Sequence, residues 1–154
     1  MRYLTEILAK VIFMGILAAF IASCAGERPK NPGVTSGLLL SCPSSPNCVS
    51  SQAADDVHRI APLSFGVDPD TAFLLLKQIL SSRRDTRIMA EEAGYLRAEF
   101  HTTFFVDDGE FLMDRASGVI HVRSASRIGY SDFGKNRSRM EDIRRNFETA
   151  AKKQ

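Results

Sequence analysis

The chain has 154 residues, with 20 Lys and Arg against 18 Asp and Glu, so its formal net charge is +2. This near balance excludes a strongly basic histone-like or ribosomal-type protein and an acidic tail protein. Hydrophobic residues make up 44% of the chain and charged residues 25%, which is typical of a globular protein and not of a disordered one. The length corresponds to a single domain.

The N-terminal residues have the pattern of an export signal. Arg2 and Lys10 make the leading region positive, and residues 11–22 form an uncharged, largely apolar run. A membrane span needs about 20 apolar residues, so this shorter run better suits a signal peptide. It leads to Cys24, which follows an aliphatic and two small residues. This ending resembles the bacterial lipobox, whose cysteine is acylated and whose chain is cut just before it. A transmembrane anchor or an uncleaved apolar N-terminus is the alternative.

The lipobox resemblance implies a chain attached to a membrane through lipid. We expect residues 1–23 to be a lipoprotein signal peptide, residues 24–37 a flexible tether, and residues 38–154 one α+β domain. Fatty acyl chains such as palmitate on Cys24 would anchor the protein in the cell envelope, facing the periplasm or the exterior, since each buried methylene contributes about 0.8 kcal/mol. An Asp after the cysteine would resemble an inner-membrane retention signal. Ala25 stands there, so the outer membrane is favoured.

Two further cysteines, Cys42 and Cys48, flank five residues that include two prolines. Outside the cytoplasm such a pair usually oxidises, so we predict a structural disulfide that shapes a local bend. A metal pair would need two more soft ligands nearby, and a redox pair usually has two residues between its thiols. Both remain alternatives, and we expect no metal or other cofactor.

The domain begins with a short edge strand, predicted over residues 57–63, in which Pro62 limits pairing. A helix follows, with Asp68 as its cap, Pro69 in its first turn and Asp70 complementing the helix dipole. Apolar residues at helical spacing predict the buried side of this helix. They are Ala72, Phe73, Leu75, Leu76, Ile79 and Leu80.

A run of strands is predicted next. Residues 86–92 form one strand, and residues 95–107 alternate between apolar and polar side chains along a second. The Asp-Asp-Gly at residues 107–109 predicts a tight turn. Strands over residues 110–114 and 119–125 complete the meander.

The last predicted helix covers residues 138–151, because Ser138 and Glu141 have the spacing of a capping box. Its buried stripe consists of Met140, Ile143, Phe147 and Ala150. The element order predicts a two-layer α+β fold, in which two amphipathic helices cover one face of an antiparallel meander of about four to five strands.

Two long motifs resemble one family. They are residues 42–51, which contain both predicted disulfide cysteines, and residues 122–139, which are rich in arginine, serine and glycine. Residues 107–111 also fit, although Gly109 stands where the family pattern suggests an aliphatic residue. Together they resemble the uncharacterised family known as domain of unknown function 1499, over about residues 38–147. The resemblance implies a small exported or membrane-associated domain, and it brings no activity and no catalytic residue.

The segment from residue 123 to residue 145 is the candidate binding site, because its charged residues are mostly positive. Planar guanidinium groups bind phosphate or carboxylate bidentately, so an anionic lipid or a cell-wall acid is the expected ligand. Alternatively, Asp132 holds Arg127 or Arg137 and the segment is a structural latch. The predicted anion-binding residues are Arg123, Ser124, Ser126, Arg127, Asn136, Arg137 and Arg139.

Catalytic signatures are weak. A nucleophile-elbow motif and a phosphate-binding glycine loop do not occur in the sequence, and His101, His121 and Glu99 lack metal-ligand spacing. The modest charge argues against nucleic-acid binding. We therefore expect no catalytic residue and predict a lipid-anchored binding or envelope-assembly module whose protein partners the sequence does not identify. The alternative is a small hydrolase or transferase acting on envelope lipid or cell-wall material.

Overall fold

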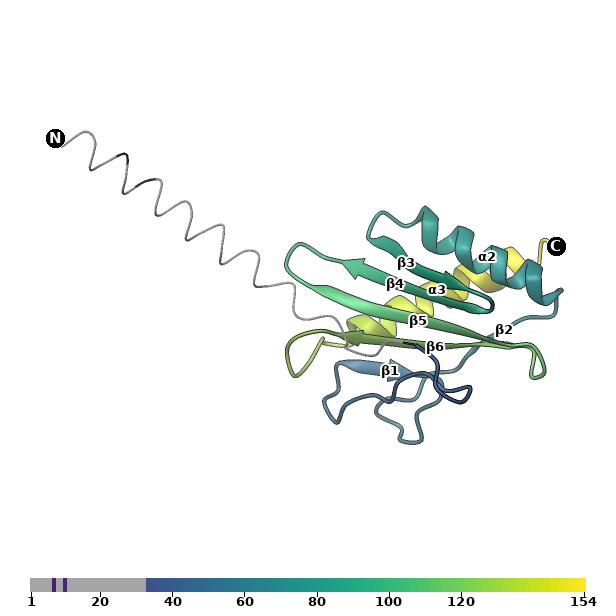
Figure 1. The fold of residues 1–154 in the computed structure, drawn as a ribbon, viewed down its shortest axis with the longest axis horizontal. Helices are drawn as coiled ribbons and strands as arrows, with labels where there is room; N and C mark the ends of the chain where they lie inside the picture. The colour runs from purple at the N-terminus through teal and green to yellow at the C-terminus, as the bar shows by residue number, and fades with distance from the viewer. Residues whose placement is uncertain (1–6, 8–9, 11–32) are drawn as a thin grey trace.

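An antiparallel sheet with two helices on one face makes up the fold (Figure 1). The structure is a computed structural model that describes Ile7, Lys10 and residues 33–154. Cys24, with its predicted signal and acylation, lies outside the described residues. The strand order is β1-β6-β5-β4-β3, and β2 pairs with β6 beside β1. The elements are β1 (Cys48–Ser50), β2 (Leu63–Ser64), α2 (Pro69–Ser82), β3 (Thr86–Glu92), β4 (Tyr95–His101), β5 (Val106–Asp114), β6 (Val119–Ser126) and α3 (Lys135–Ala151).

This architecture confirms the predicted α+β fold. The sheet has six strands rather than four to five, because β1 and the short β2 add to the predicted meander. Neither α2 nor α3 is long and apolar enough to cross a bilayer, and this holds for every helix among the described residues.

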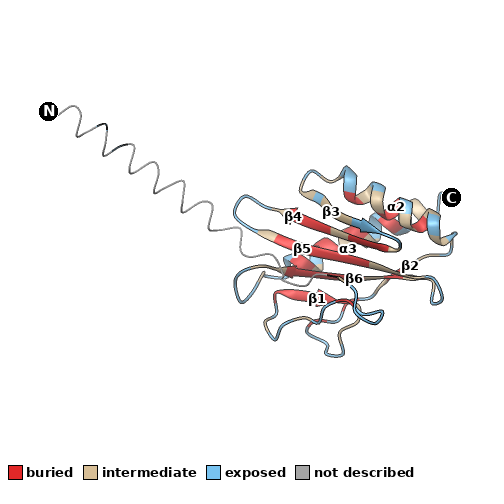
Figure 2. Cartoon of the chain, viewed as in Figure 1, coloured by how far each residue is buried: buried red, intermediate tan, exposed pale blue. Residues whose placement is uncertain are grey.

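The core lies between the helices and one face of the sheet. Alternate residues of β4, namely Leu96, Ala98 and Phe100, are fully buried there, as the two-residue period predicts. The sheet is most deeply buried along β4, β5 and β6 (Figure 2). The predicted stripes of both helices meet these strands in a single cluster. The fully buried apolar residues of the helices are Ala72, Leu76, Leu80, Met140, Ile143 and Phe147.

Capping explains where α2 begins. The side chain of Asp68 accepts a hydrogen bond from the Thr71 N–H at 3.0 Å, and Pro69 occupies the first helical position. The hydrogen bond from this backbone N–H lowers the pKa of Asp68 below its usual value. The predicted start of this helix is confirmed.

The turn predicted at residues 107–109 is wrong. The chain reverses between β4 and β5, at residues 102–105, and Gly109 lies inside β5 opposite Ala98. A Cβ at Gly109 would lie 2.3 Å from Cε2 of Phe100, so only glycine leaves room for that ring. The glycine that suggested a turn is therefore required for packing.

The predicted start of α3 is also wrong by one turn. The helix begins at Lys135, after Gly134 in a left-handed conformation, and Ser138 lies inside it. The carboxylate of Asp132 accepts from the N–H groups of Gly134 and Asn136 at 3.0 and 2.7 Å. This acidic side chain satisfies the first turn, so the capping box of Ser138 and Glu141 does not start the helix.

The first part of the domain is held by covalent and backbone contacts. The disulfide between Cys42 and Cys48 is present, as predicted. The edge strand predicted over residues 57–63 is reduced to a bridge between Ser50 and Arg59, followed by the two-residue β2. Just before the disulfide loop, Leu39 is buried, while Leu38 and Leu40 on either side of it are exposed.

Candidate functional site

Strand alternation divides the predicted anion-binding residues between the two faces of the sheet. Ser124 and Ser126 of β6 face α3, because both contact Asn136 of that helix. Arg123 and Arg127 face the other way, toward carboxylates of β4 and β5. The structure therefore does not bring the seven residues together into one surface.

Arg127 is clamped between two carboxylates on the face away from the helices. Its Nε and Nη2 donate to the two oxygens of Asp108, both at 2.8 Å, and Nη2 also donates to Glu99 at 2.6 Å. The side chains of all three residues are almost fully buried. The hydrogen bonds that Arg127 donates to Asp108 and then to Glu99 raise the pKa of its guanidinium, although burial alone would lower it. The guanidinium is already engaged in the bidentate geometry that an anionic ligand would need.

Arg123 lies further along the same face and pairs with Glu110. Its Nη1 donates to Glu110 Oε2 at 3.1 Å, while Glu110 Oε1 accepts from the Tyr95 hydroxyl at 2.8 Å and the Gly33 N–H at 3.0 Å. Burial and then the charge and hydrogen bond of Glu110 raise the pKa of the Tyr95 phenol. Arg123 Nε is a buried donor without a partner among the described residues, so this pair is less completely satisfied than Arg127.

The third buried pair lies under α3. Arg139 donates to Asp107 at 2.7 Å and to Asn136 Oδ1 at 2.9 Å, and its guanidinium lies 4.6 Å from the centre of the Phe100 ring. Asn136 also donates to the carbonyl of Asn47, beside the disulfide. This cluster joins the start of α3, the sheet and the disulfide loop. We call Arg123, Arg127 and Arg139 with their carboxylates Glu99, Asp107, Asp108 and Glu110 the arginine network.

The remaining arginine of the predicted set is bound by backbone. Arg137 donates to the carbonyls of Arg59 and Val57 at 2.7 and 2.8 Å. Asp132, which the latch hypothesis assigned to Arg127 or Arg137, instead accepts backbone N–H groups at the start of α3. Ion pairs do tie the arginines of this segment to the sheet, but their carboxylates are Asp107 and Asp108. With the turn placed correctly, the alternation along β5 would have indicated that these two carboxylates face opposite sides of the sheet.

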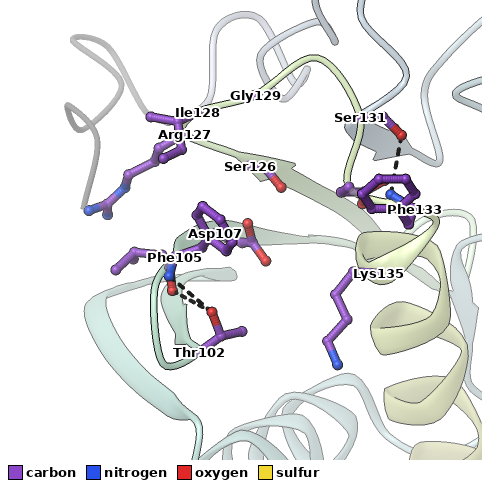
Figure 3. A pocket seen from close by; sticks show the side chains of 12 residues that line it. Thr102, Phe105, Asp107, Ser126, Arg127, Ile128, Gly129, Ser131, Phe133 and Lys135 are labelled. Atoms are coloured by element: carbon purple, nitrogen blue, oxygen red, sulfur yellow. Dashed lines mark hydrogen bonds between the residues drawn. The ribbon is translucent and has the colours of Figure 1, made fainter. Parts of the chain in front are cut away.

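A pocket opens at the end of the sheet where β4 and β6 finish (Figure 3). It lies between the β4–β5 turn and the loop that joins β6 to α3, and its volume is about 180 Å³. Most of its surface is apolar, supplied in part by Phe105, Ile128 and Phe133. Ser126 and Arg127 are the members of the predicted set that line it. Apolar walls with a few polar groups are typical of ligand pockets.

One positive side chain at the rim remains available. Lys135, the first residue of α3, lines the pocket, and its ammonium makes no hydrogen bond or ion pair within the part of the chain that the structure describes. The side chain is exposed, so it can move toward a ligand. Lys135 lay in the positive segment of the sequence, but nothing in the sequence separated it from the arginines, which are held by the fold.

The same end of the sheet carries exposed aromatic residues. Phe104 is 69% exposed, Tyr130 76% and Phe133 98%. Phe133 also has a positive φ of 53°, a backbone conformation that is costly for a bulky residue and that recurs at functional sites. Sequence reasoning missed these residues, although aromatic side chains in a polar, glycine-containing loop were a signal. We call Phe104, Phe105, Ile128, Tyr130 and Phe133 the aromatic tip.

The histidines do not form the cluster that was considered from the sequence. His101 Nε2 lies 3.2 Å from Glu99 Oε2 at the end of β4. His121 lies on β6, two strands away, where Nδ1 is 3.1 Å from Ser51 Oγ and Nε2 is 3.9 Å from Asp114 Oδ2. In the described part of the chain, no group of three or more His, Cys, Asp or Glu side chains is placed to hold a metal ion.

A comparison with protein families identifies the domain. The family described as "Protein of unknown function (DUF1499)" matches residues 38–147. The chain belongs to this family. The resemblance seen in residues 42–51 and 122–139 is therefore confirmed, and the DUF1499 match contains the arginine network, the pocket and the aromatic tip. The searches of curated proteins and of solved structures found no match.

Proposed function

We propose that this DUF1499 protein is a lipid-anchored binding module of the cell envelope and that the pocket beside Lys135 binds an anionic amphiphile. One observation carries the proposal: an apolar pocket at the end of the sheet has an unpaired ammonium at its rim. The pocket supplies the apolar contact, and Lys135 supplies a positive charge. The two carboxylates of the lining already have partners, Asp107 in Arg139 and Asp132 in backbone N–H groups. Lipid-derived acids and acylated cell-wall acids share this chemistry.

The size of the pocket limits what it takes. Pockets for whole drug-sized ligands measure about 300–1,000 Å³. The volume of about 180 Å³ suits the end of an acyl chain or a single ring, with the acid group left at the rim. The N–H groups of Gly134 and Asn136 are already used by Asp132, so the start of α3 does not bind the acid. Lys135 is therefore the residue that selects for negative charge.

The arginine network supports the site without binding the ligand in this proposal. Arg127 lines the pocket but gives its donors to Asp108 and Glu99. An external anion could bind the Arg127 guanidinium only if Asp108 and Glu99 released it. The Arg-rich surface inferred from the sequence remains a broader version of the proposal, and variants of Arg127 and Lys135 separate the two.

Binding is tested with the full chain and simple probes. Decanoate, decanol and decyltrimethylammonium are titrated while backbone amide signals are followed by NMR. We expect decanoate to shift signals from residues 102–106 and 126–135 most strongly. Lys135→Gln should weaken decanoate binding about two- to fivefold, as for an exposed ion pair, and leave decanol binding unchanged. Phe105→Ser should weaken both.

Lys152→Gln is the matched control, since Lys152 is an exposed lysine just after the other end of α3. Equal binding of decanoate and decyltrimethylammonium, or no change near the pocket, would contradict the proposal. Anchoring is tested separately by intact-mass analysis of native protein. An acylated chain that begins at Cys24 is expected, and an unprocessed chain without acyl groups would contradict the anchor.

A small envelope hydrolase is the second candidate, because the His121 ring lies between a hydroxyl and a carboxylate. Its Nδ1 is near Ser51 Oγ, and its Nε2 is near Asp114 Oδ2. In such an array His121 would take the hydroxyl proton as Ser51 attacks an ester or amide. The separation of 3.9 Å from His121 to Asp114 is longer than a hydrogen bond, and Ser51 Oγ also accepts from the Val122 N–H at 2.9 Å. The geometry therefore favours the binding module.

The hydrolase candidate is tested by covalent labelling. If it holds, a fluorophosphonate probe should label Ser51 in the full chain, and labelling should disappear in Ser51→Ala and fall strongly in His121→Gln. The absence of labelling at Ser51 would remove the candidate, and decanoate binding would be unaffected by that result.

A further inference from the structure

We infer that the aromatic tip is a membrane-docking surface, which inserts into the headgroup region of a lipid bilayer. The inference goes beyond the proposed function because it does not require the pocket to hold any ligand. It uses the proposed lipid anchor only to bring the domain near the bilayer. The tip residues come from two separate segments, the β4–β5 turn and the loop after β6, which meet at the same end of the sheet (Figure 1).

The first argument is the chemistry of the exposed side chains. Three aromatic residues, Phe104, Tyr130 and Phe133, are each more than two-thirds exposed, and Phe105 and Ile128 add further apolar surface. Contiguous apolar surface of this kind marks contact with a membrane or another protein. Aromatic rings, and tyrosine in particular, are favoured at the headgroup level, where an apolar ring and a polar end are both satisfied.

The second argument is that the protein holds these rings outward. In the β4–β5 turn, the Thr102 N–H donates to the Phe105 carbonyl at 2.9 Å, and Thr102 Oγ1 accepts from the Phe105 N–H at 3.0 Å. In the other loop, Asn47 Nδ2 donates to the Gly129 carbonyl at 2.6 Å. Ordered loops do not lose conformational freedom on docking, so more of the contact energy favours binding. Exposed rings on hydrogen-bonded loops therefore fit a docking role better than incidental exposure.

The third argument is charge. Within the two tip segments the carboxylate of Asp132 is held by backbone N–H groups at the positive end of the α3 dipole, and the guanidinium of Arg127 is paired with Asp108 and Glu99. The ammonium of Lys135 is left free beside the rings among the described residues. The charged side chain that can still move toward a partner is therefore Lys135, and its ammonium beside exposed rings complements an anionic lipid headgroup.

The fourth argument is reach. Gly33 donates to Glu110, which lies four residues from Val106 at the tip end of β5, or about 13 Å along the strand. Cys24 precedes Gly33 by nine residues, and a chain of that length spans at most about 30 Å. A lipid on Cys24 would therefore keep the tip within reach of the bilayer that holds the anchor.

The absence of tryptophan from the chain gives a direct test. Phe104→Trp and Tyr130→Trp each place one fluorophore on the tip, and neither residue lines the pocket. Leu74→Trp is the control, because Leu74 is an exposed apolar residue on α2, away from the tip. Full-length acylated protein is reconstituted in vesicles of phosphatidylethanolamine and phosphatidylglycerol, with and without a shallow spin-labelled lipid that quenches tryptophan.

We expect emission from the tip reporters to shift to shorter wavelength and to lose at least half its intensity with the quenching lipid, while the control reporter changes little. Adding Phe104→Glu to the Tyr130→Trp variant should return its emission to the control level. Three results would overturn the inference: tip reporters that match the control, a wavelength shift without lipid quenching, which would mean that a protein or second copy covers the tip, or insensitivity to Phe104→Glu. None of these results changes the decanoate titration, so failure of docking and failure of the pocket are distinguishable.

Discussion

The arginine network and the aromatic tip lie next to each other but differ in which side chains they bury. In the network, groups that water would solvate well are buried and paired, as in the contact of Arg127 with Asp108 and Glu99. In the tip, rings that the core would accept are left exposed, with Phe133 almost completely so. Positive charge in the sequence is therefore a poor guide to binding here. The groups that remain free after folding are the better guide.

Breaking the network should give the largest effect. Arg127→Ala leaves the Asp108 carboxylate buried without its cation and removes one partner of Glu99, so we expect a loss of about 3–5 kcal/mol in the free energy of unfolding. Urea denaturation measures it. Arg145→Ala is the control, since Arg145 forms an exposed pair with Asp142, and it should cost less than about 1 kcal/mol. Similar losses for Arg127→Ala and Arg145→Ala would show that the network is not structural.

Crowding the strands beneath the network should give the next effect. In Gly109→Ala the added Cβ meets the Phe100 ring, so we expect a loss of about 1–3 kcal/mol. Gly66→Ala is the matched control, because a Cβ there meets nothing within 4 Å. Thermal and urea unfolding measure both variants. In a Phe100→Leu background the cost of Gly109→Ala should shrink, and an unchanged cost would exclude this contact as the cause.

Alkaline pH should weaken the network side of the sheet through Tyr95, whose hydroxyl donates to Glu110. The pKa of Tyr95 is raised in the folded protein. The stability that its protonated hydroxyl contributes is therefore fully present below the ordinary tyrosine pKa of about 10 and is lost as pH rises above that value. Tyr95→Phe should flatten the decline of stability above about pH 10, measured by urea unfolding across pH. An unchanged decline in Tyr95→Phe would contradict this assignment.

Changing the tip should have the smallest effect on stability. Phe104→Ser and Tyr130→Ser remove exposed rings, so each should alter the free energy of unfolding by no more than about 0.5 kcal/mol. Phe147→Ala, in the core, is the contrast and should cost about 3–5 kcal/mol. Urea denaturation compares the three variants. A loss above 1 kcal/mol for either tip variant would mean that its ring packs in the fold.

The comparison also shows what sequence alone could predict. The helical stripes and the alternation of Leu96 and Phe100 identified both layers, because burial follows the periods of helix and strand directly. Gly109 and Ser138 misled, because a glycine can serve packing as well as a turn, and Asp132 starts α3 one turn before the capping box. Pairing across strands depends on register, so the partners of Arg123 and Arg127 could not be assigned from the sequence.

One contact links the tip to the redox state of the chain. Asn47, which lies between the two disulfide cysteines, contacts the loop that carries Tyr130 and Phe133. Its side chain donates to the Gly129 carbonyl, and its own carbonyl accepts from Ser126 and Asn136. A reduced chain lacks the covalent closure that steadies Asn47 beside Cys48. We expect reduction of the disulfide to loosen this loop, so that an oxidised chain holds the tip rings in a fixed orientation and a reduced chain does not.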